Sequence, residues 1–319
     1  MHAEYHCDLP STVGTAQRGG SVTDGTTVQA GPLATWAHAL RVRQWIKNGL
    51  VIAVPLASGA IIEPEVMAAT AVAFAAFCLG ASSIYLLNDI HDREEDRAHP
   101  TKRSRPIASG QISARAGTTV AAVLAAAALA ISLLASTALG GVVAAYLMLS
   151  YAYTLGLKHQ PVLDIAVVAA GFVLRALAGG AAAGIVPSQW FLMAAAFGSL
   201  FLVSGKRYSE VLLAGDGVGL FRRSLKGYTR GYLRFVWTLA ATVTVATYAL
   251  WAFEMQAELA VPALAQLSIV PFVLAILRYA VEIEAGGAGA PEEVALRSPV
   301  LQALGVAWLV LFVLGVWYG

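Results

Sequence analysis

Residues 65–96 read EVMAATAVAFAAFCLGASSIYLLNDIHDREED. The first part, from 65 to 87, is almost entirely apolar, and a helix of about 20 such residues can cross the hydrocarbon core of a bilayer. The second part, from Asn88 to Asp96, is rich in acidic side chains. This stretch therefore predicts a membrane-spanning helix that ends in a cluster of carboxylates at the membrane surface.

The composition of the whole chain also indicates that lipid, and not water, surrounds most of it. Of its 319 residues, 58% are hydrophobic and only 13% are charged, whereas soluble domains carry about 25% charged residues. The apolar runs are also much longer than the roughly 9–11 residues of a membrane β-strand, and they do not alternate. We therefore predict an all-α, polytopic membrane protein with nine transmembrane helices, at residues 46–62, 65–87, 114–135, 138–156, 162–185, 188–204, 232–253, 262–281 and 300–318.

The distribution of basic residues indicates how the chain crosses the membrane. All but one of the 21 Lys and Arg residues fall in the N-terminal arm or in every second loop after it, and the exception is Arg175. The opposite loops, near Glu63, Thr137, Pro187 and Glu258, contain none. Because basic loops stay on the cytoplasmic side, we expect a multi-pass protein of the plasma (inner) membrane with a cytoplasmic N-terminus and active site and an external C-terminus.

Residues 1–30 differ from the rest of the chain. They are rich in Gly, Ser, Thr and Gln and lack the apolar core of a signal peptide. We expect them to form a disordered cytoplasmic tail, and residues 31–319 to form one transmembrane catalytic domain with a cytoplasmic polar cavity. Cys7 lies in the tail and Cys78 in the run 65–87, so the sequence predicts no disulfide framework.

The acidic end of the run 65–87 has the spacing of a binding face. If the helix continues, Asn88, Asp92 and Asp96 lie at i, i+4 and i+8, with Asp89 beside them. Like charges at this spacing repel, and a helix C-terminus disfavours carboxylates. A magnesium ion would relieve the repulsion, because it takes oxygen ligands, typically one or two carboxylates plus substrate phosphates. The alternative is a solvated acidic helix end paired with neighbouring arginines.

The loop that follows, from His99 to Gly110, is basic and contains two prolines, so it is not expected to be helical. Its cations Lys102, Arg103 and Arg105 could hold phosphate oxygens beside a metal. The alternative is contact with anionic lipid at the membrane surface. Acidic residues interleaved with the basic ones favour the more specific interpretation.

Two charged residues belong to the run 162–185. Arg175 would be costly if it faced lipid, so we expect it in the bundle interior, either paired with Asp164 or a backbone carbonyl, or in the wall of a polar cavity. Asp164 opens this run, where the helix dipole favours a carboxylate; a role in the site, on a sugar hydroxyl or a metal-bound water, is the other interpretation. Glycines at 171, 179, 180 and 184 predict close helix packing.

The motif N-D-x-x-D-x-x-x-D, which Asn88 to Asp96 match in full, resembles that of the UbiA superfamily of intramembrane prenyltransferases. The resemblance runs from about Leu33 onward and implies a UbiA-like helical bundle. One departure is clear. Most members carry a second acidic motif, D-x-x-x-D, in the loop after the sixth helix, whereas this chain has Lys206 and Arg207 there and Asp216 stands alone. Cations in place of carboxylates indicate a substrate with more phosphate.

Residues 43–48, 99–110, 153–164 and 205–208 look like the branch of the superfamily that transfers phosphoribosyl groups. That branch implies phosphoribosyl diphosphate as the donor, decaprenyl (polyprenyl) phosphate in the membrane lipid as the acceptor, and Mg²⁺ as the cofactor. The expected catalytic carboxylates are Asp89, Asp92 and Asp96, and the expected metal ligands are Asn88, Asp92 and Asp96. The expected substrate-binding residues are Gln44, Lys47, Asn48, Asn88, Lys102, Arg103, Arg105, Tyr153, Lys158, Asp164, Arg175, Lys206, Arg207 and Tyr208.

Two other functions are weighed against this one. A UbiA-type enzyme could move a polyprenyl group from its diphosphate to an aromatic acceptor, but it usually has the second acidic motif. A transporter or lipid-binding protein would spread polar residues through several helices, whereas Arg175 alone is deeply placed and charged. We expect no nucleic acid partner, and a homo-oligomer is compatible with the sequence.

Overall fold

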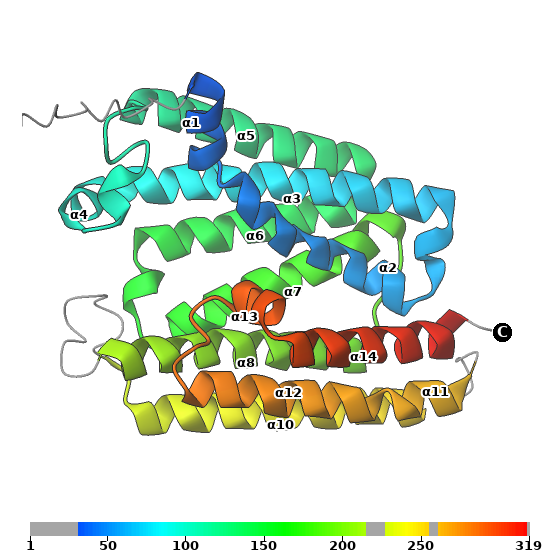
Figure 1. The fold of residues 1–319 in the computed structure, drawn as a ribbon. Helices are drawn as coiled ribbons and strands as arrows, with labels where there is room; N and C mark the ends of the chain where they lie inside the picture. Colours follow the sequence, from blue (N-terminus) through cyan, green and yellow to red (C-terminus); the bar gives the residue numbers. More distant parts are fainter. Residues whose placement is uncertain (1–30, 215–226, 255–260, 318–319) are drawn as a thin grey trace, which may run out of the picture.

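The computed structural model describes residues 31–214, 227–254 and 261–317, and every regular element in these ranges is helical. Seven helices are long and apolar enough to cross a membrane (Figure 1). They are α3 (Pro64–His91), α5 (Ala114–Ala135), α6 (Thr137–Leu155), α7 (Leu163–Ala183), α10 (Arg230–Glu254), the pair α11 (Pro262–Leu267) and α12 (Ile269–Glu284), and α14 (Pro299–Trp317). The chain is therefore a multi-pass membrane protein.

The predicted count of nine spanning helices is wrong at two places. The expected first span, 46–62, is broken into the 3₁₀ helix η1 (Val42–Ile52), the short α2 (Ala53–Ala57) and η2 (Ala60–Ile62). The expected span 188–204 lies in α8 (Gln189–Ala214), which runs on past Lys206, Arg207 and Glu210 and is not among the seven. Both segments belong to the bundle, but the first is not one regular helix and the second is not apolar along its whole length.

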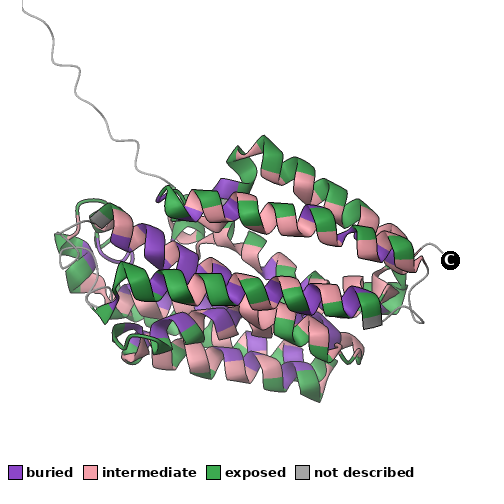
Figure 2. Ribbon diagram, turned by 90° about the horizontal axis from the view of Figure 1, so that it is seen from below, coloured by how far each residue is buried: buried purple, intermediate pink, exposed green. Residues whose placement is uncertain are grey.

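The helices form two packed groups that share α7. In the first group α3 packs against α5, α6, α7 and η1, and in the second α8 packs against α7 and α10, while α12 packs against α14. Serine side chains cap two of these helices: Ser113 accepts from the Ala116 N–H of α5 (3.2 Å), and Ser136 accepts from the Leu139 N–H of α6 (3.0 Å). Figure 2 shows exposed positions along the outward faces of the helices, as expected where lipid is the solvent.

The short polar elements lie towards one end of the bundle. At the left of Figure 1, α4 (Arg93–Ala98) follows α3, and the loop containing η3 (Lys102–Ser104) leads to α5. The turn η4 (Leu157–His159) joins α6 to α7 at the same end. The remaining short helices are α1 (Pro32–Ala39) and α13 (Pro291–Arg297). This end is where the motif of residues 88–96 is placed.

Glycines in α7 allow η1 and α2 to pack directly on its surface. A Cβ atom at Gly179 would lie 2.0 Å from the Val51 carbonyl oxygen, and one at Gly180 would lie 2.6 Å from Val54 Cγ1. Real Cβ atoms do not approach so closely, so only glycine fits at either position. The prediction of close packing is confirmed at these two residues, and their partner is the irregular segment that replaces the expected first span. It is wrong at Gly184, which ends α7 at φ 72° and where a Cβ atom would meet nothing within 4 Å.

We predict that Gly179→Ala destabilises the protein by about 1–3 kcal/mol, because the added methyl group must displace the backbone of η1. The measurement is the midpoint of thermal unfolding in detergent. Gly141→Ala in α6 is the matched control, since a Cβ atom there meets nothing within 4 Å; an equal shift in both variants would contradict the close-packing account.

Candidate functional site

The carboxylates at the end of α3 are held by arginines from two other segments. Asp89 is buried and pairs with Arg41, which precedes η1. Arg105 Nη1 donates to Asp89 Oδ1 (3.1 Å) and to Asp96 Oδ2 (2.7 Å). The guanidinium of Arg41 also lies over the ring of Tyr85, 4.8 Å from its centroid. This cluster fixes the N-terminal arm and the basic loop against the acidic motif.

The predicted straight continuation of the helix is wrong in one respect. α3 ends at His91, and Asp92 (φ −90°, ψ 9°) forms the junction with α4. The backbone still makes i to i−4 hydrogen bonds through the junction, from Asp92 N–H to Asn88 (2.9 Å) and from Asp96 N–H to Asp92 (2.8 Å). The expected face of Asn88, Asp92 and Asp96 is therefore bent rather than broken.

Lys158 connects this cluster to the other half of the bundle. It belongs to η4, between α6 and α7, and its ammonium group pairs with Asp92. The Lys158 side chain is 8% exposed and that of Asp92 is 20% exposed, so the carboxylate is the more accessible partner. The pair spans 66 positions in the sequence and closes the acidic motif against the α6–α7 turn.

A second buried carboxylate organises the start of α7. Asp164 is fully buried and accepts from Arg207 Nε of α8 (3.1 Å) and from the Tyr228 hydroxyl. Arg207 also donates to Glu210 (2.7 Å). Asp164 is therefore more than a charge at the helix N-terminus, because its carboxylate joins α7, α8 and Tyr228, which lies two residues before α10; the alternative role on a sugar hydroxyl or a metal-bound water stays a prediction.

The backbone beside Asp164 is strained. Val162 has φ 71°, which is unusual for a β-branched residue, and its N–H donates to the Tyr228 hydroxyl oxygen. Burial, and after it the hydrogen bond to the Asp164 carboxylate, raise the pKa of Tyr228 above its ordinary value. The phenol therefore stays protonated and can donate to Asp164 while it accepts from Val162.

A cavity of about 360 Å³ lies beside this second cluster. Four residues of the predicted site contribute its polar lining: Lys47, Tyr153, Lys206 and Arg207. Apolar residues from four different segments, η1, α7, α8 and α13, complete it: Leu50, Val168, Phe172, Leu202, Val203 and Pro291. The cavity is thus amphipathic, with cations and an aliphatic wall in the same space.

Arg175 lies in the bundle interior as expected, but Asp164 is not its partner. Its donors reach Asn48 Oδ1 (2.9 Å), the Gly171 carbonyl (2.8 Å) and the Tyr146 hydroxyl (2.9 Å). The guanidinium also lies 4.7 Å from the centroid of the Tyr146 ring. Of the two interpretations, the backbone-carbonyl partner is the one observed, and Arg175 ties η1 to α6 and α7 beneath the cavity.

Some predicted residues do not converge on these clusters. Gln44 lies half-buried in η1, Lys102 is half-buried, and Arg103 is exposed. The Tyr208 hydroxyl donates to Glu284 (2.9 Å) and accepts from Arg234 (2.7 Å), so it faces α10 and α12. Asp216 and the basic residues from 222 to 226, like the tail 1–30, lie outside the described residues.

The donor set at the end of α3 suits magnesium only in part. Within the described ranges, no group of three or more His, Cys, Asp or Glu side chains converges as a metal site made of protein alone requires. Asn88, Asp92 and Asp96 nevertheless offer hard oxygen atoms, and magnesium typically needs only one or two carboxylates when substrate phosphates complete its shell. The residues therefore fit an ion that arrives with a diphosphate.

Three residues of these clusters were not predicted. Arg41 carries a signal, since it lies two positions before the stretch 43–48, but in the sequence its charge is explained equally well as one of the basic residues of the N-terminal arm. Glu210 lies three residues after Arg207, a spacing at which side chains of a helix can pair, so this contact could have been predicted. For Tyr228 no local signal exists, because its partner Asp164 lies 64 positions away.

Comparison with known proteins gives a consistent result. Residues 49–285 match the model of the UbiA prenyltransferase family. A Corynebacterium glutamicum protein named decaprenyl-phosphate phosphoribosyltransferase is 51% identical over 284 residues, covering 88% of this chain and 86% of that protein. A Mycolicibacterium smegmatis protein of the same name is 51% identical over 282 residues, covering 85% of this chain and 89% of that protein.

Solved structures extend the comparison to the fold. A UbiA homologue from Archaeoglobus fulgidus, determined with bound DMAPP and Mg²⁺, superposes with a TM-score of 0.68 at 18% identity, covering 87% of this chain and 96% of that one. At this identity the likeness concerns the fold alone, and it confirms the predicted UbiA-like helical bundle.

Because Arg175 stabilises the interior, Arg175→Met should lower the midpoint of thermal unfolding in detergent. The substitution leaves Asn48 and Tyr146 without their buried partner, at a cost of about 1–3 kcal/mol for each orphaned group. Arg115→Met, at an exposed position at the start of α5, provides the comparison. Unchanged stability in Arg175→Met would show that the arginine has a role other than joining these helices.

Proposed function

This chain belongs to the UbiA prenyltransferase family, and from that premise we propose that it transfers the 5-phosphoribosyl group of phosphoribosyl diphosphate to decaprenyl phosphate. The products are decaprenylphosphoryl-5-phosphoribose and diphosphate. The observation that carries the proposal is the 51% identity, along nearly the whole chain, to proteins named for this activity. The many cations that converge on one end of the bundle support it independently, because both substrates bring phosphate.

Asn88, Asp92 and Asp96 are proposed to hold Mg²⁺ on the diphosphate of the donor. When bound, the ion supplies positive charge that offsets the charge developing on the leaving oxygens. The UbiA homologue solved with Mg²⁺ supports the use of a divalent ion. Asp92 is the most accessible of these carboxylates, and its partner Lys158 can move its ammonium group onto a phosphate oxygen when the donor arrives.

Asp89 is assigned a positioning role rather than a ligand role. Its carboxylate is 3% exposed and is shared by two arginines, Arg41 and Arg105, whereas the equally buried Asp96 pairs with Arg105 alone. Holding these two guanidinium groups in place sets the donors that bind the diphosphate, since arginine forks match phosphate oxygens. Lys102 and Arg103, which lie nearer the surface, are proposed to guide the donor into the site.

The amphipathic cavity suits the acceptor. A polyprenyl phosphate needs an apolar wall for its first isoprene units and cations for its head, and the cavity lining includes both the apolar Leu50 and Phe172 and the cations Lys47 and Lys206. The lipid phosphate is already an anion, so it attacks C1 of the ribose without a general base. A C1–oxygen bond to the lipid phosphate forms as the C1–oxygen bond to diphosphate breaks.

The Asp164 cluster is proposed to orient Arg207 toward this cavity. The guanidinium donates through Nε to Asp164, which Tyr228 holds in turn, and through Nη1 to Glu210. With Tyr153 beside it in the lining, Arg207 can contact the 5-phosphate or a ribose hydroxyl. Asn48 and Arg175, which lie beneath, keep Lys47 in place through η1.

The remaining proposals concern the cell. Basic loops at the acidic end of α3 support an active site on the cytoplasmic face of the plasma membrane, where a soluble, charged donor is available. A lipid-linked phosphoribose made there would supply the arabinan of arabinogalactan for cell wall biogenesis. We propose this destination for the product.

The first experiment is donor choice. Purified protein in detergent with Mg²⁺ should form a labelled lipid from phosphoribosyl diphosphate and decaprenyl phosphate, and none from a polyprenyl diphosphate and an aromatic acid. Both products are measured by thin-layer chromatography of the lipid extract. Product from the second mixture alone would overturn the substrate assignment and favour the aromatic prenyltransferase activity.

The metal proposal makes a separate prediction. Asp92→Asn should lower turnover by about 10²–10³-fold, the scale typical of losing one electrostatic contact to a developing charge, while folding and membrane insertion persist. Glu94→Gln is the matched control, because Glu94 is an exposed carboxylate two residues away that pairs with Arg93 and Arg97. Turnover of Asp92→Asn near the wild-type value would remove the metal role.

A further inference from the structure

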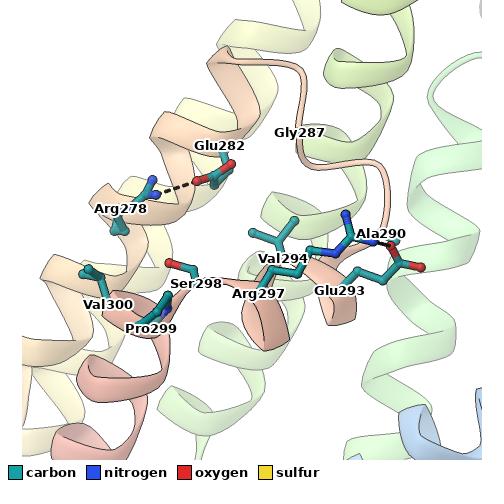
Figure 3. A pocket seen from close by; sticks show the side chains of 10 residues that line it. All are labelled: Arg278, Glu282, Gly287, Ala290, Glu293, Val294, Arg297, Ser298, Pro299 and Val300. Carbon is teal, nitrogen blue, oxygen red and sulfur yellow. Dashed lines mark hydrogen bonds and ion pairs between the residues drawn. The ribbon is translucent and has the colours of Figure 1, made fainter.

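A second cavity, of about 380 Å³, lies apart from the proposed reaction site. It is bounded by α12, α13 and the start of α14, and Figure 3 shows charged side chains from two of these helices around it. It shares no lining residue with the amphipathic cavity, although α13 contributes to both: Pro291 lines one, and Glu293 and Arg297 line the other.

The charges in this second cavity are balanced. On α12, Arg278 Nη2 donates to Glu282 Oε1 (2.6 Å), and on α13, Arg297 Nη2 lies 3.2 Å from Glu293 Oε2. Two guanidinium groups and two carboxylates therefore surround one space. A simple anion would meet both carboxylates there, and a simple cation would meet both guanidinium groups.

Backbone geometry keeps the space open at Glu282. The last turn of α12 is closed by Gly286, at φ 78°, and by a hydrogen bond from the Gly287 N–H to the Glu282 carbonyl (2.8 Å). A Cβ atom at Gly287 would lie 2.9 Å from Glu282 Oε2. The carboxylate occupies its position because residue 287 has no side chain.

The surface next to the cavity is apolar. Val270, Leu274, Leu277 and Val281 are exposed at i, i+4, i+7 and i+11, which places them along one face of α12. In the membrane-spanning windows of α12 and α14, only 22% and 11% of residues are buried in the protein. Lipid chains must therefore cover this surface, beside Arg278 and Glu282 on the same helix.

From these observations we propose that the second cavity binds the headgroup of a zwitterionic phospholipid that carries a primary ammonium group. The lipid phosphate accepts from Arg278 and Arg297, and the ammonium group donates to Glu282 and Glu293. The acyl chains lie along the exposed face of α12. A free phosphate lacks both the ammonium group and the chains, and an anionic lipid lacks the ammonium group, so charge complementarity favours the zwitterion. The inference does not depend on the proposed enzymatic activity.

The test is lipid retention. Wild-type protein reconstituted in nanodiscs with equal amounts of phosphatidylethanolamine and phosphatidylglycerol is released into detergent, and co-purifying lipid is counted by native mass spectrometry. Wild type should retain phosphatidylethanolamine about tenfold over phosphatidylglycerol. Arg278→Gln should lower that retention about tenfold, the effect of losing one hydrogen bond to a charged group.

The Glu282→Gln variant tests the headgroup preference more directly, because it removes one of the two carboxylates that repel an anionic headgroup. This variant should lose the preference and retain phosphatidylglycerol at least as well. Arg234→Gln is the matched control: Arg234 pairs with Glu284 but does not line the cavity, so retention should equal wild type. The proposal is overturned if wild type prefers phosphatidylglycerol, if Glu282→Gln keeps the wild-type preference, or if Arg278→Gln behaves like the control.

Discussion

Two buried carboxylates, Asp89 and Asp164, constrain the polar end of this membrane protein. A carboxylate removed from water is costly unless a cation and hydrogen bonds compensate it. For both carboxylates the partners come from distant segments: Arg41 and Arg105 pair with Asp89, and Arg207 and Tyr228 donate to Asp164. The N-terminal arm, the basic loop, α8 and the start of α10 are thereby held in fixed positions. The proposed phosphate binding depends on the same pairs, since each carboxylate keeps an arginine in place.

The features that could be predicted from the sequence are those that depend on local pattern. The features that could not be predicted depend on contacts between residues far apart in the chain. Apolar runs gave most of the spanning helices, and the spacing of Asn88, Asp92 and Asp96 gave the acidic face. The partner of Arg175 could not be predicted, because Asn48 lies 127 positions away and an arginine in a helix interior can satisfy its donors in several ways. The prediction of a spanning helix over 46–62 is wrong for a different reason. This segment packs directly against Gly179 and Gly180, and it is not the regular helix that its apolar composition alone suggests.

One short helix, α13, contributes lining residues to both cavities. α13 places Pro291 beside the polar and aliphatic lining of the first cavity and Glu293 and Arg297 beside the second. Val294, which also lines the second cavity, is buried in the core with Tyr279 and Ile283. Among the side chains of α13 that the structure describes, it is the buried one, so it anchors the helix while the paired Glu293 and Arg297 line the second cavity.

The 3₁₀ geometry of η1 makes that segment a three-sided rod, because side chains at i and i+3 are eclipsed. One edge faces the protein interior and comprises Trp45, Asn48 and Val51. The second includes the cavity residues Lys47 and Leu50, and Gln44 falls in line with them. The third is largely exposed and comprises Arg43, Ile46, Gly49 and Ile52. The position of a residue within each group of three thus assigns it to the protein interior, the cavity side or the exposed surface. Insertion or deletion of a single residue would exchange all three assignments at once, so the length of this segment is under stronger constraint than the identity of most residues in it.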